Sequence, residues 1–588
     1  MSNNKLLKLR NEMKKNGIDA YIIPSSDAHQ SENVAEYFKG RRWISNFTGS
    51  AGTAVITADS AGLWTDGRYF IQAEKELKES GFDLFKMATE GFPTYPEWLK
   101  KVLKKDGVIG FDGKVVSISA YNELRKEFDE DNFKTQKDLL ESIWDDRPNF
   151  PKKNIFIHDL SYAGKSTSEK IENIRKIYHS YGADSYIISS LDDIAWTFNL
   201  RGSDVLNNTT FYSYALIEDD KKTLFIDSNK LDKQIKLYLE KNSVILKSYD
   251  EITDVLSNIK EKSIYLCPER TSIYIKSVLQ NNKIIYGNEI TTHLKAIKNE
   301  VEIKNLKECY LTDSVALLKS FKYIEENFRK TPITELDVEK IIEKERSKID
   351  RFKGISFDTI AGHKDHAALM HFKANKKNTY TLDPQGFLLV DSGGQYLNGT
   401  TDITRTFSLG DITSEQKKDF TLVLKSVITL SRAKFLKGTT GYKLDMLARY
   451  PLWLEGLDYK CGTGHGIGFF LNIHEGPQGF STKKTHDIPL EIGMNLTIEP
   501  GVYKEGRHGI RTENTVIIKE AFTNENGTFY DFETISFFPI DINSIDPSLL
   551  NKEELEWINT YHSTTFNKLS PLLNEDETNW LRDKTKQI

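Results

Sequence analysis

The segment from Gly386 to Thr406 constrains this chain more than any other, because it places two aspartates on neighbouring strands. The apolar run 387–390 predicts a buried strand that ends at Asp391. Gly-Gly and Asn-Gly pairs then supply turn chemistry, and Asp402 follows among strand-forming residues. Such a hairpin can aim both carboxylates into one cavity, where they repel each other unless a cation or a proton lies between them. On these residues alone, the alternative stays open that Asp391 starts a turn and Asp402 is a solvated strand residue.

Three downstream segments each carry an acid or an imidazole on or beside a strand, with glycine close by. His465 lies among four glycines, Glu499 follows an apolar strand that Pro-Gly stops, and Glu513 enters a β-branched run. Glycine lets the backbone approach a ligand closely, and a charge in a buried strand is costly unless it is paired. Taken singly, each residue has a structural alternative: a core histidine, a strand-edge residue and half of an ion pair. The recurrence of one pattern in separate segments favours a common site.

The five residues together suit a pair of divalent cations. They are Asp391, Asp402, His465, Glu499 and Glu513. Two divalent cations would neutralise the four carboxylates. Oxygen ligands with one imidazole and no thiolate suit Mn or Co, with Zn and Fe as alternatives. Two metals about 3.5–4 Å apart can lower the pKa of a bound water toward ~7 and polarise a carbonyl, so the set predicts hydrolysis.

With these flanks and in this order, the set resembles the metal ligands of the pita-bread metallopeptidases, a group that includes methionine aminopeptidase, prolidase and aminopeptidase P. The segments DSGGQYLNGTTDITRTF, GTGHGIGFFLNIHEGP, IEPGVY and GIRTEN are similar to the three-domain, cytosolic type of aminopeptidase P (Xaa-Pro aminopeptidase). DAHQSE (27–32), GSAGTAVIT (49–57), WTDGRYF (64–70) and LDDIAWTFNLRGSD (191–204) extend the resemblance along essentially the whole chain.

The resemblance implies a metallo-aminopeptidase that releases the N-terminal residue from peptides with proline in second position. It implies that Asp391 holds one metal and that Asp402 and Glu513 bridge both. His465 and Glu499 then complete the other metal. In this family a hydroxide activated between two metal ions attacks the Xaa-Pro carbonyl. We expect the metal ions to be Mn²⁺, with Co²⁺ or Zn²⁺ as alternatives. Glu499 also shuttles its proton to the leaving nitrogen.

The resemblance also implies a set of substrate contacts. His371 and His474 match histidines that donate to the developing oxyanion, while Tyr503 and Arg511 line the proline side of the cleft. One position departs from the family: a histidine is usual four residues before the metal histidine, and this chain has Cys461. A thiol is a weaker donor than imidazole, so Cys461 is expected to change product-side contacts. A small buried thiol and a soft extra ligand both remain open readings of this residue.

A pattern of helix, glycine and strand occurs twice before the metal hairpin. Asp19-Ala-Tyr-Ile-Ile returns as Asp184-Ser-Tyr-Ile-Ile, which predicts two related α/β domains. We predict an α/β (α+β) chain with domains at 1–150, 151–296 and 297–588. The resemblance makes the first two creatinase-type domains and the third a pita-bread catalytic domain with a C-terminal helical extension. Asp27 and His29 in the first domain stay open between a functional and a structural role.

Composition gives no sign of nucleic-acid or membrane partners. The chain has 588 residues, 28% of them charged, with a net charge of −5 and no basic block. Its apolar runs are far shorter than a membrane span, and the first eight residues lack the apolar core of a signal peptide. Three widely spaced cysteines do not form a disulfide framework. We therefore expect a cytoplasmic protein, and the resemblance implies a homodimer.

Two rival functions remain. A prolidase-like dipeptidase would cleave only Xaa-Pro dipeptides and would need a group that binds the substrate carboxylate. A non-catalytic pita-bread binding protein is the rival from another class. Such relatives lose metal ligands, whereas all five matching residues are present here.

Overall fold

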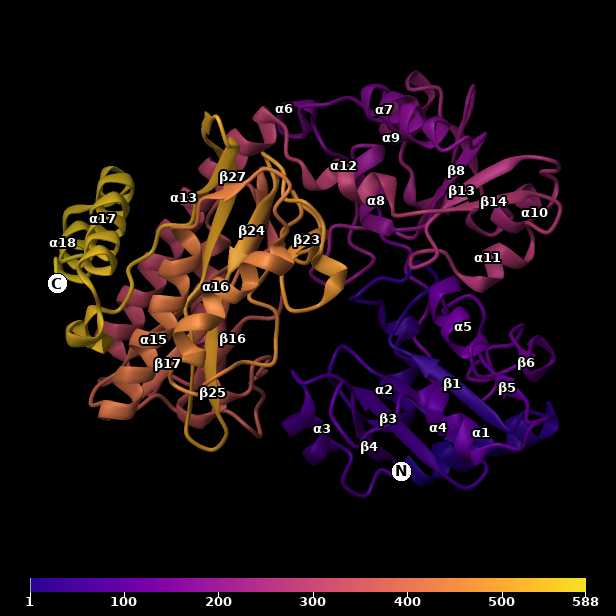
Figure 1. Cartoon of the computed structure of the whole chain (residues 1–588), viewed down its shortest axis with the longest axis horizontal. Coiled ribbons are helices and arrows are strands. Elements are labelled where there is room, and N and C mark those ends of the chain that lie inside the picture. Colours follow the sequence, from indigo (N-terminus) through magenta and orange to yellow (C-terminus); the bar gives the residue numbers. More distant parts are fainter. Residues whose placement is uncertain (1) are drawn as a thin grey trace. The chain divides into compact units, whose positions relative to one another are not determined.

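The computed structural model describes residues 2–588, which form two compact units. The first unit contains the chain up to His158 together with Lys165–Thr291. The second contains Asp159–Gly164 and Thr292–Ile588. Figure 1 shows the helices and strands of both units, labelled and coloured by their position in the sequence. No helix in the described part of the chain is both long and apolar enough to span a bilayer.

The first unit contains two six-stranded sheets that share one topology. One sheet has the order β4-β3-β2-β1-β5-β6, with β1 Ala20–Pro24, β2 Thr53–Thr57, β3 Ala61–Thr65, β4 Asp83–Lys86, β5 Ile109–Gly110 and β6 Phe133–Lys134. The other has the order β12-β11-β10-β8-β13-β14, with β8 Ser185–Ile188, β10 Ser213–Glu218, β11 Lys222–Ile226, β12 Ile245–Lys247, β13 Ser263–Leu266 and β14 Lys283–Tyr286. The central strands β1 and β8 each pair antiparallel with one neighbour and parallel with the other. The duplication predicted from the repeated sequence pattern is therefore seen in the strand order.

Helices cover these sheets with their apolar sides. They are α1 Ser2–Lys15, α2 Gly40–Ser45, α3 Phe70–Glu76, α4 Tyr95–Val102, α5 Ile118–Arg125, α7 Thr167–Ser180, α8 Leu191–Thr197, α9 Lys233–Lys241, α10 Ile252–Ser257 and α11 Ile273–Ser277. On α1, Leu6, Leu9 and Met13 are buried in the core of the first sheet. Helical spacing puts these side chains on one face, which explains why the segment folds as an amphipathic helix.

Asp27 and His29 form a buried cluster that joins the two halves of the first unit. The Nδ1 atom of His29 donates to the carbonyl of Ser189 at 2.7 Å, and its Nε2 atom accepts from the Tyr249 hydroxyl at 2.7 Å. The Tyr212 hydroxyl donates to Oδ2 of Asp27 at 2.9 Å. These three partners belong to the second half, so the cluster has a structural role.

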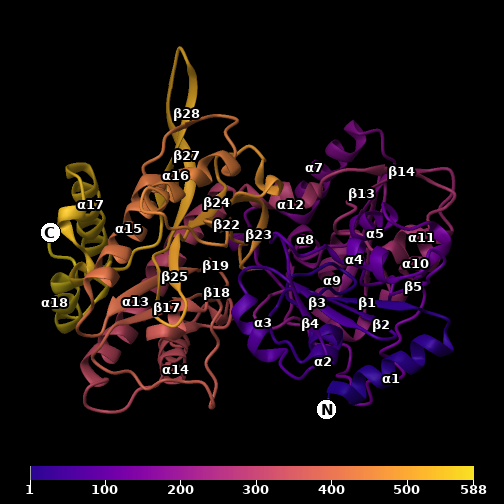
Figure 2. The same cartoon turned by 60° about the horizontal axis from the view of Figure 1, so that its bottom comes forward.

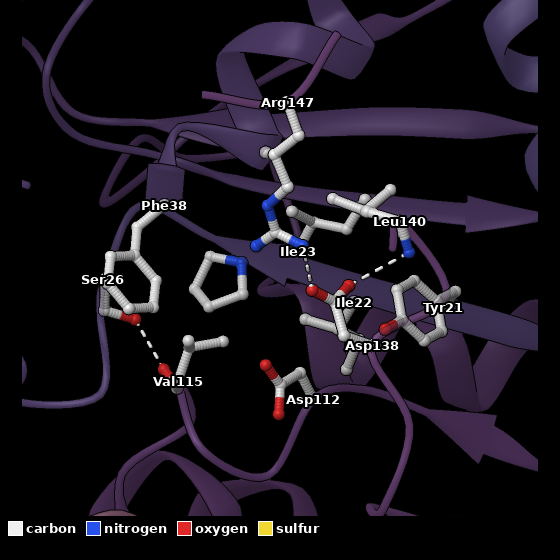
Figure 3. Close-up of a pocket in the computed structure, with 12 residues that line it drawn as sticks. Tyr21, Ile22, Ile23, Ser26, Phe38, Asp112, Val115, Asp138, Leu140 and Arg147 are labelled. Atoms are coloured by element: carbon white, nitrogen blue, oxygen red, sulfur yellow. Dashed lines mark hydrogen bonds and ion pairs between the residues drawn. The ribbon is translucent and has the colours of Figure 1, made fainter. Parts of the chain in front are cut away.

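A small cavity in the same unit is lined by residues of β1 and of the segment after β5 (Figure 3). Its volume is about 30 Å³, room for about one water molecule. Asp112 and the ion pair of Asp138 with Arg147 contribute its polar lining. None of its lining residues belongs to the predicted metal set.

The second unit carries the metal hairpin and the later motifs on four sheets. One three-stranded sheet has β16 Ile360–His363, β17 Phe387–Ser392 and β20 Ile403–Ser408, and another has β15 Phe352–Ile355, β18 Gly394–Tyr396 and β19 Gly399–Thr400. A six-stranded sheet has the order β21 Phe435–Leu436, β28 Gly527–Thr534, β27 Asn514–Asn524, β24 Asn495–Ile498, β22 Gly464–Gly466 and β23 Glu475–Phe480. The pair β25 Gly501–Lys504 and β26 His508–Arg511 completes the set.

Long helices pack around these strands. They are α13 Glu300–Asn327, α14 Glu335–Arg346, α15 Ser414–Ser431, α16 Gly441–Trp453, α17 Lys552–Leu569 and α18 Glu575–Lys584. A capping box of Thr334 and Asp337 opens α14. Figures 1 and 2 show α17 and α18 side by side at one edge of this unit. The Trp580 indole of α18 donates to Glu325 of α13 at 2.6 Å, which helps to dock the C-terminal helices.

Candidate metal centre

The predicted hairpin is present, with a second hairpin inside it. Strands β17 and β20 run antiparallel, and Asp391 lies opposite Thr404. Between them, β18 and β19 form a small hairpin in a different sheet. Asp391 lies within β17, whereas the sequence placed it at the strand end, and Asp402 lies directly before β20. Both aspartates are buried.

Three of the predicted ligands meet directly. One ligand atom from each of Asp402, His465 and Glu513 lies within 4.8 Å of the other two. The Nε2 atom of His465 is 3.5 Å from Oδ2 of Asp402 and 3.2 Å from Oε1 of Glu499. Asp391 lies beside them and affects the pKa of Glu513 electrostatically. The structure thus brings residues from four separate segments into what we call the Asp402 cluster, defined as Asp391, Asp402, His465, Glu499 and Glu513.

The backbone around His465 fixes the orientation of its ring. The ring's Nδ1 atom lies 2.9 Å from the carbonyl oxygen of Gly466, which can only accept, so Nδ1 carries the proton. The Nε2 atom of the ring then faces the carboxylates of Asp402 and Glu499. Gly464 is required next to it, because a Cβ there would lie 1.9 Å from the carbonyl oxygen of Thr497. The Thr497 hydroxyl accepts from the His465 amide at 3.0 Å and donates to Glu499 at 3.1 Å.

The electrostatics of the Asp402 cluster show that the protein alone does not satisfy its charges. Burial, together with Asp402 and Glu499, raises the pKa of Asp391 to about 7 against the opposing effect of Arg511. Burial and the same acidic neighbours raise the pKa of Glu513 well above its usual range. Burial would lower the pKa of His465, but hydrogen bonds with Asp402 and Glu499 raise it well above normal. These shifts describe acids held together at a high cost in electrostatic repulsion.

Two oxygens of the cluster are left without protein partners. Among the described residues, Oδ1 of Asp391 and Oε1 of Glu513 are buried and make no hydrogen bond. Buried acceptors of this kind call for a bound ion or water. A donor set of carboxylate oxygens with one imidazole suits hard or intermediate divalent metals. The residues therefore fit a dinuclear metal site, and the side chains of His465 and Glu499, each 20% exposed, mark its opening.

The predicted substrate residues lie at different distances from the cluster. The His474 ring packs edge-on against the His465 ring, with 4.3 Å between centroids. Arg511 donates to Asp391 at 2.6 Å and to the Tyr503 hydroxyl at 2.7 Å. His371 is half-buried and follows Met370, whose carbonyl oxygen accepts from Arg511 at 3.4 Å.

Cys461 lies in the segment that leads into His465, four positions before it. It is half-buried and packs in the same apolar core as Tyr503. Its carbonyl oxygen accepts from Nη2 of Arg449 at 2.7 Å, which fixes the backbone of this segment. Within the described residues, the group of potential ligand atoms comprises Asp402, His465 and Glu513, without the thiol.

Sequence reasoning missed the hydroxyl groups that hold the ligands. Thr404 donates to Oε2 of Glu513 at 2.8 Å, and Thr497 holds Glu499. Thr404 lies on β20 two positions after Asp402, and Thr497 lies on β24 two positions before Glu499. In extended backbone, side chains two positions apart point to the same face. That spacing of two was the signal available in the sequence.

Comparisons with known proteins agree along the whole chain. Family models described as the Creatinase/Prolidase N-terminal domain match residues 5–143 and 146–302. Metallopeptidase family M24 matches residues 304–520, and the C-terminal region of peptidase M24 matches 528–588.

Several relatives share nearly the full length. "Probable Xaa-Pro aminopeptidase P" of Talaromyces marneffei is 40% identical over 99% of this chain and 92% of its own length. Aminopeptidase P2 of Arabidopsis thaliana is 39% identical over 97% of this chain and 86% of its own. The crystal structure of X-prolyl aminopeptidase from Caenorhabditis elegans, described as a cytosolic enzyme with a di-nuclear active site, matches with a TM-score of 0.96. It is 34% identical, and the match covers 100% of both chains.

These matches confirm the predicted fold class, with two creatinase-type domains before a pita-bread domain. They also agree with the acidic Asp402 cluster, since a di-nuclear active site is described for the structural neighbour. The chain is a metallopeptidase that belongs to the Xaa-Pro aminopeptidase P family, within the wider M24 metallopeptidases.

Proposed function

We propose that this protein releases the N-terminal residue from peptides that carry proline in second position. The observation that carries the proposal is the buried Asp402 cluster, whose unpartnered oxygens fit two divalent cations. Its position in a chain that is 34–40% identical to aminopeptidases of this class supports the substrate. The prolidase alternative receives no comparable support from the full-length relatives.

Asp391 would hold one metal, His465 and Glu499 would hold the other, and Asp402 and Glu513 would contribute to both. Mn²⁺ is our first choice, with Co²⁺ or Zn²⁺ as alternatives, because the donor set has four carboxylates, one imidazole and no thiolate.

When bound, a pair of divalent cations lowers the pKa of a water molecule and polarises the scissile carbonyl. Glu499 is placed to accept the proton of that water and deliver it to the prolyl nitrogen, since its carboxylate reaches the opening of the site. His474, packed against His465, and His371 are the proposed donors to the oxyanion. Tyr503 and Arg511 hydrogen-bond to each other and form one wall of the proline pocket. Proline needs such a dedicated pocket because it lacks an N–H and has a fixed φ.

The enzyme is proposed to work as a cytoplasmic homodimer on peptides, without nucleic-acid or membrane partners. An exposed apolar stripe on and just after α16 supports the dimer: Met446 is 56% exposed, Tyr450 58%, Trp453 42% and Leu454 67%. A second copy could cover this stripe through a two-fold contact. Leu454→Asp should shift the molecular mass measured by light scattering from dimer toward monomer. A wild-type mass equal to one chain would contradict the dimer.

The decisive test is the release of the first residue from Xaa-Pro-Yaa tripeptides. Activity should disappear after chelation and return when Mn²⁺, Co²⁺ or Zn²⁺ is added. Xaa-Ala-Yaa tripeptides serve as the control for proline recognition, and Xaa-Pro dipeptides test the prolidase alternative. Cleavage of dipeptides alone, or full activity in the chelated protein, would overturn the proposal.

A further inference from the structure

Strand β20 presents different residues to its two sides. Asp402 and Thr404 face the metal cluster, so the alternation of a strand turns Arg405 to the opposite side. Arg405 is buried, and among the described residues it forms no ion pair with a carboxylate. A buried guanidinium is costly unless its donors are satisfied.

Hydrogen bonds from Arg405 connect the metal hairpin to the C-terminal region. Its Nη1 atom donates to the carbonyl oxygens of Thr404 and Glu513. Its Nε and Nη2 atoms donate to the carbonyl of Phe538 at 3.2 and 2.8 Å, and Nη2 also reaches Oδ1 of Asn514 at 2.9 Å. Arg405 therefore contacts the backbone of the proposed metal ligand Glu513, the side chain of Asn514 and the backbone of Phe538, which follows β28.

Tyr561 of α17 completes this arrangement. Its hydroxyl accepts from Nη2 of Arg405 at 2.6 Å and from the Phe538 amide at 3.1 Å. The same hydroxyl lies 3.2 Å from Oδ1 of Asn514. Tyr561 is itself buried, and its ring stacks on Trp557 one turn earlier, with 5.4 Å between centroids and 2° between the planes. Its hydroxyl is thus fixed in position by the packing of the helix.

Two short paths lead from Tyr561 to the carboxylate of Glu513. One runs through Arg405, whose neighbour Thr404 donates to Oε2 of Glu513 at 2.8 Å. The other path runs through Asn514, whose Oδ1 atom contacts the Tyr561 hydroxyl and which directly follows Glu513 in the chain. Groups that orient a metal ligand in this way typically contribute about 10–100-fold to metal affinity or activity.

We propose that Tyr561 is a positioning residue for Glu513, so that the C-terminal helix α17 sets the metal affinity of a site formed by distant strands. This inference rests on the proposed role of Glu513 as a metal ligand. It predicts an effect on metal binding that is larger than the effect on folding, since the hydroxyl contributes few of the apolar contacts that dock the helix.

The test compares two single substitutions on α17. Tyr561→Phe removes the acceptor of the Phe538 amide and of Arg405. His562→Phe is the matched control, because it removes the acceptor of the Ile540 amide, which donates to Nε2 of His562 at 3.1 Å. Mn²⁺ affinity is measured by competition with a chelator, alongside thermal unfolding and turnover of an Xaa-Pro-Yaa peptide.

We expect Tyr561→Phe to raise the Kd for Mn²⁺ about tenfold, with turnover recovering toward wild type at saturating Mn²⁺. The control should keep the Kd within about twofold while losing a similar amount of thermal stability. Ser536→Ala serves as a second variant should Tyr561→Phe fail to fold. The Ser536 hydroxyl donates to Oδ1 of Asn514 at 3.3 Å, so its loss should weaken Mn²⁺ binding in the same direction.

Wild-type Mn²⁺ affinity in Tyr561→Phe, or in Ser536→Ala when only that variant folds, would overturn the positioning role. Equal losses of affinity in Tyr561→Phe and His562→Phe would also overturn it, since the effect would then follow from helix docking alone. Failure of the wild-type protein to bind any divalent metal is a separate outcome. That result would contradict the proposed function and not only the role of Tyr561.

Discussion

Two buried clusters of this protein contain the same kinds of residue and differ in how far the protein satisfies them. In the first unit, the cluster of Asp27 and His29 has a protein partner for every side-chain polar atom: Asp27 accepts from the amides of His29 and Ser31 and from Tyr212. In the second unit, the Asp402 cluster holds four carboxylates and one imidazole, and two of its buried oxygens have no hydrogen-bond partner among the described residues. Completeness of hydrogen bonding, more than residue type, separates a structural cluster from a site that binds a ligand.

The largest effect that this comparison predicts is on catalysis. Glu499→Ala should lower turnover by about 10³-fold or more, because it removes both a proposed metal ligand and the proposed proton shuttle. The fold should persist, since the Glu499 side chain is 20% exposed and lies at the opening of the site. Release of the N-terminal residue and circular dichroism, measured on the same preparation, test both parts. Full activity in this variant would show that the metal ligands are misassigned.

The next effect concerns pH and the cluster in the first unit. Burial lowers the pKa of His29 to about 4. Between pH 6.5 and 4, His29 is therefore protonated in the unfolded chain and neutral in the folded chain. The free energy of unfolding then decreases as the pH falls. The loss approaches about 3 kcal/mol over this range.

Urea unfolding between pH 7 and 4.5 measures this loss, with chelator present throughout so that metal binding does not contribute. His29→Gln cannot titrate and should show a correspondingly flatter pH dependence. A variant with the wild-type slope would mean that other groups carry the acid sensitivity.

Substituting one acid in each cluster should change the free energy of unfolding in opposite directions. Asp27→Asn should destabilise the protein by about 1–3 kcal/mol, because the carboxylate accepts three hydrogen bonds. Glu513→Gln should stabilise the metal-free protein by about 1 kcal/mol. The pKa of Glu513 lies well above its usual range, so ionisation at neutral pH opposes folding. Thermal unfolding of chelated protein at pH 8 compares the two, and destabilisation by both variants would remove the distinction.

The smallest effect tests where the Asp402 cluster ends. Cys461→His should leave metal content unchanged and alter kcat/KM by about threefold, less than 1 kcal/mol, because Cys461 packs in the apolar core with Tyr503. Metal analysis of the purified variant provides the check. Loss of metal would show that the thiol is itself a ligand.

Much of the fold was accessible from the sequence because its signals are local. The repeated run at Asp19 and Asp184 reflects a real duplication, and both sheets have the same strand order. Capping boxes and apolar stripes, such as those of Thr334 and of Leu6 with Leu9, depend only on neighbouring residues. The family was accessible because its motifs are long, and the comparisons confirm it.

What the sequence did not reveal depends on contacts between distant segments. Nothing near Tyr561 indicates that its hydroxyl meets Arg405, 156 positions earlier in the chain. Likewise, only the structure shows that His29 is buried against Ser189 and Tyr249. The assignment of each ligand to a particular metal and the domain boundaries remain predictions.

The unpartnered oxygens of Asp391 and Glu513 have a consequence outside catalysis. A chain that folds before it acquires metal holds mutually repelling acids in its interior, and any ion that binds only the folded form shifts the equilibrium toward that form. Newly made protein in a metal-starved cell would spend more time unfolded and exposed to proteases. Metal supply would then govern how many copies of the enzyme survive, in addition to how fast each copy works.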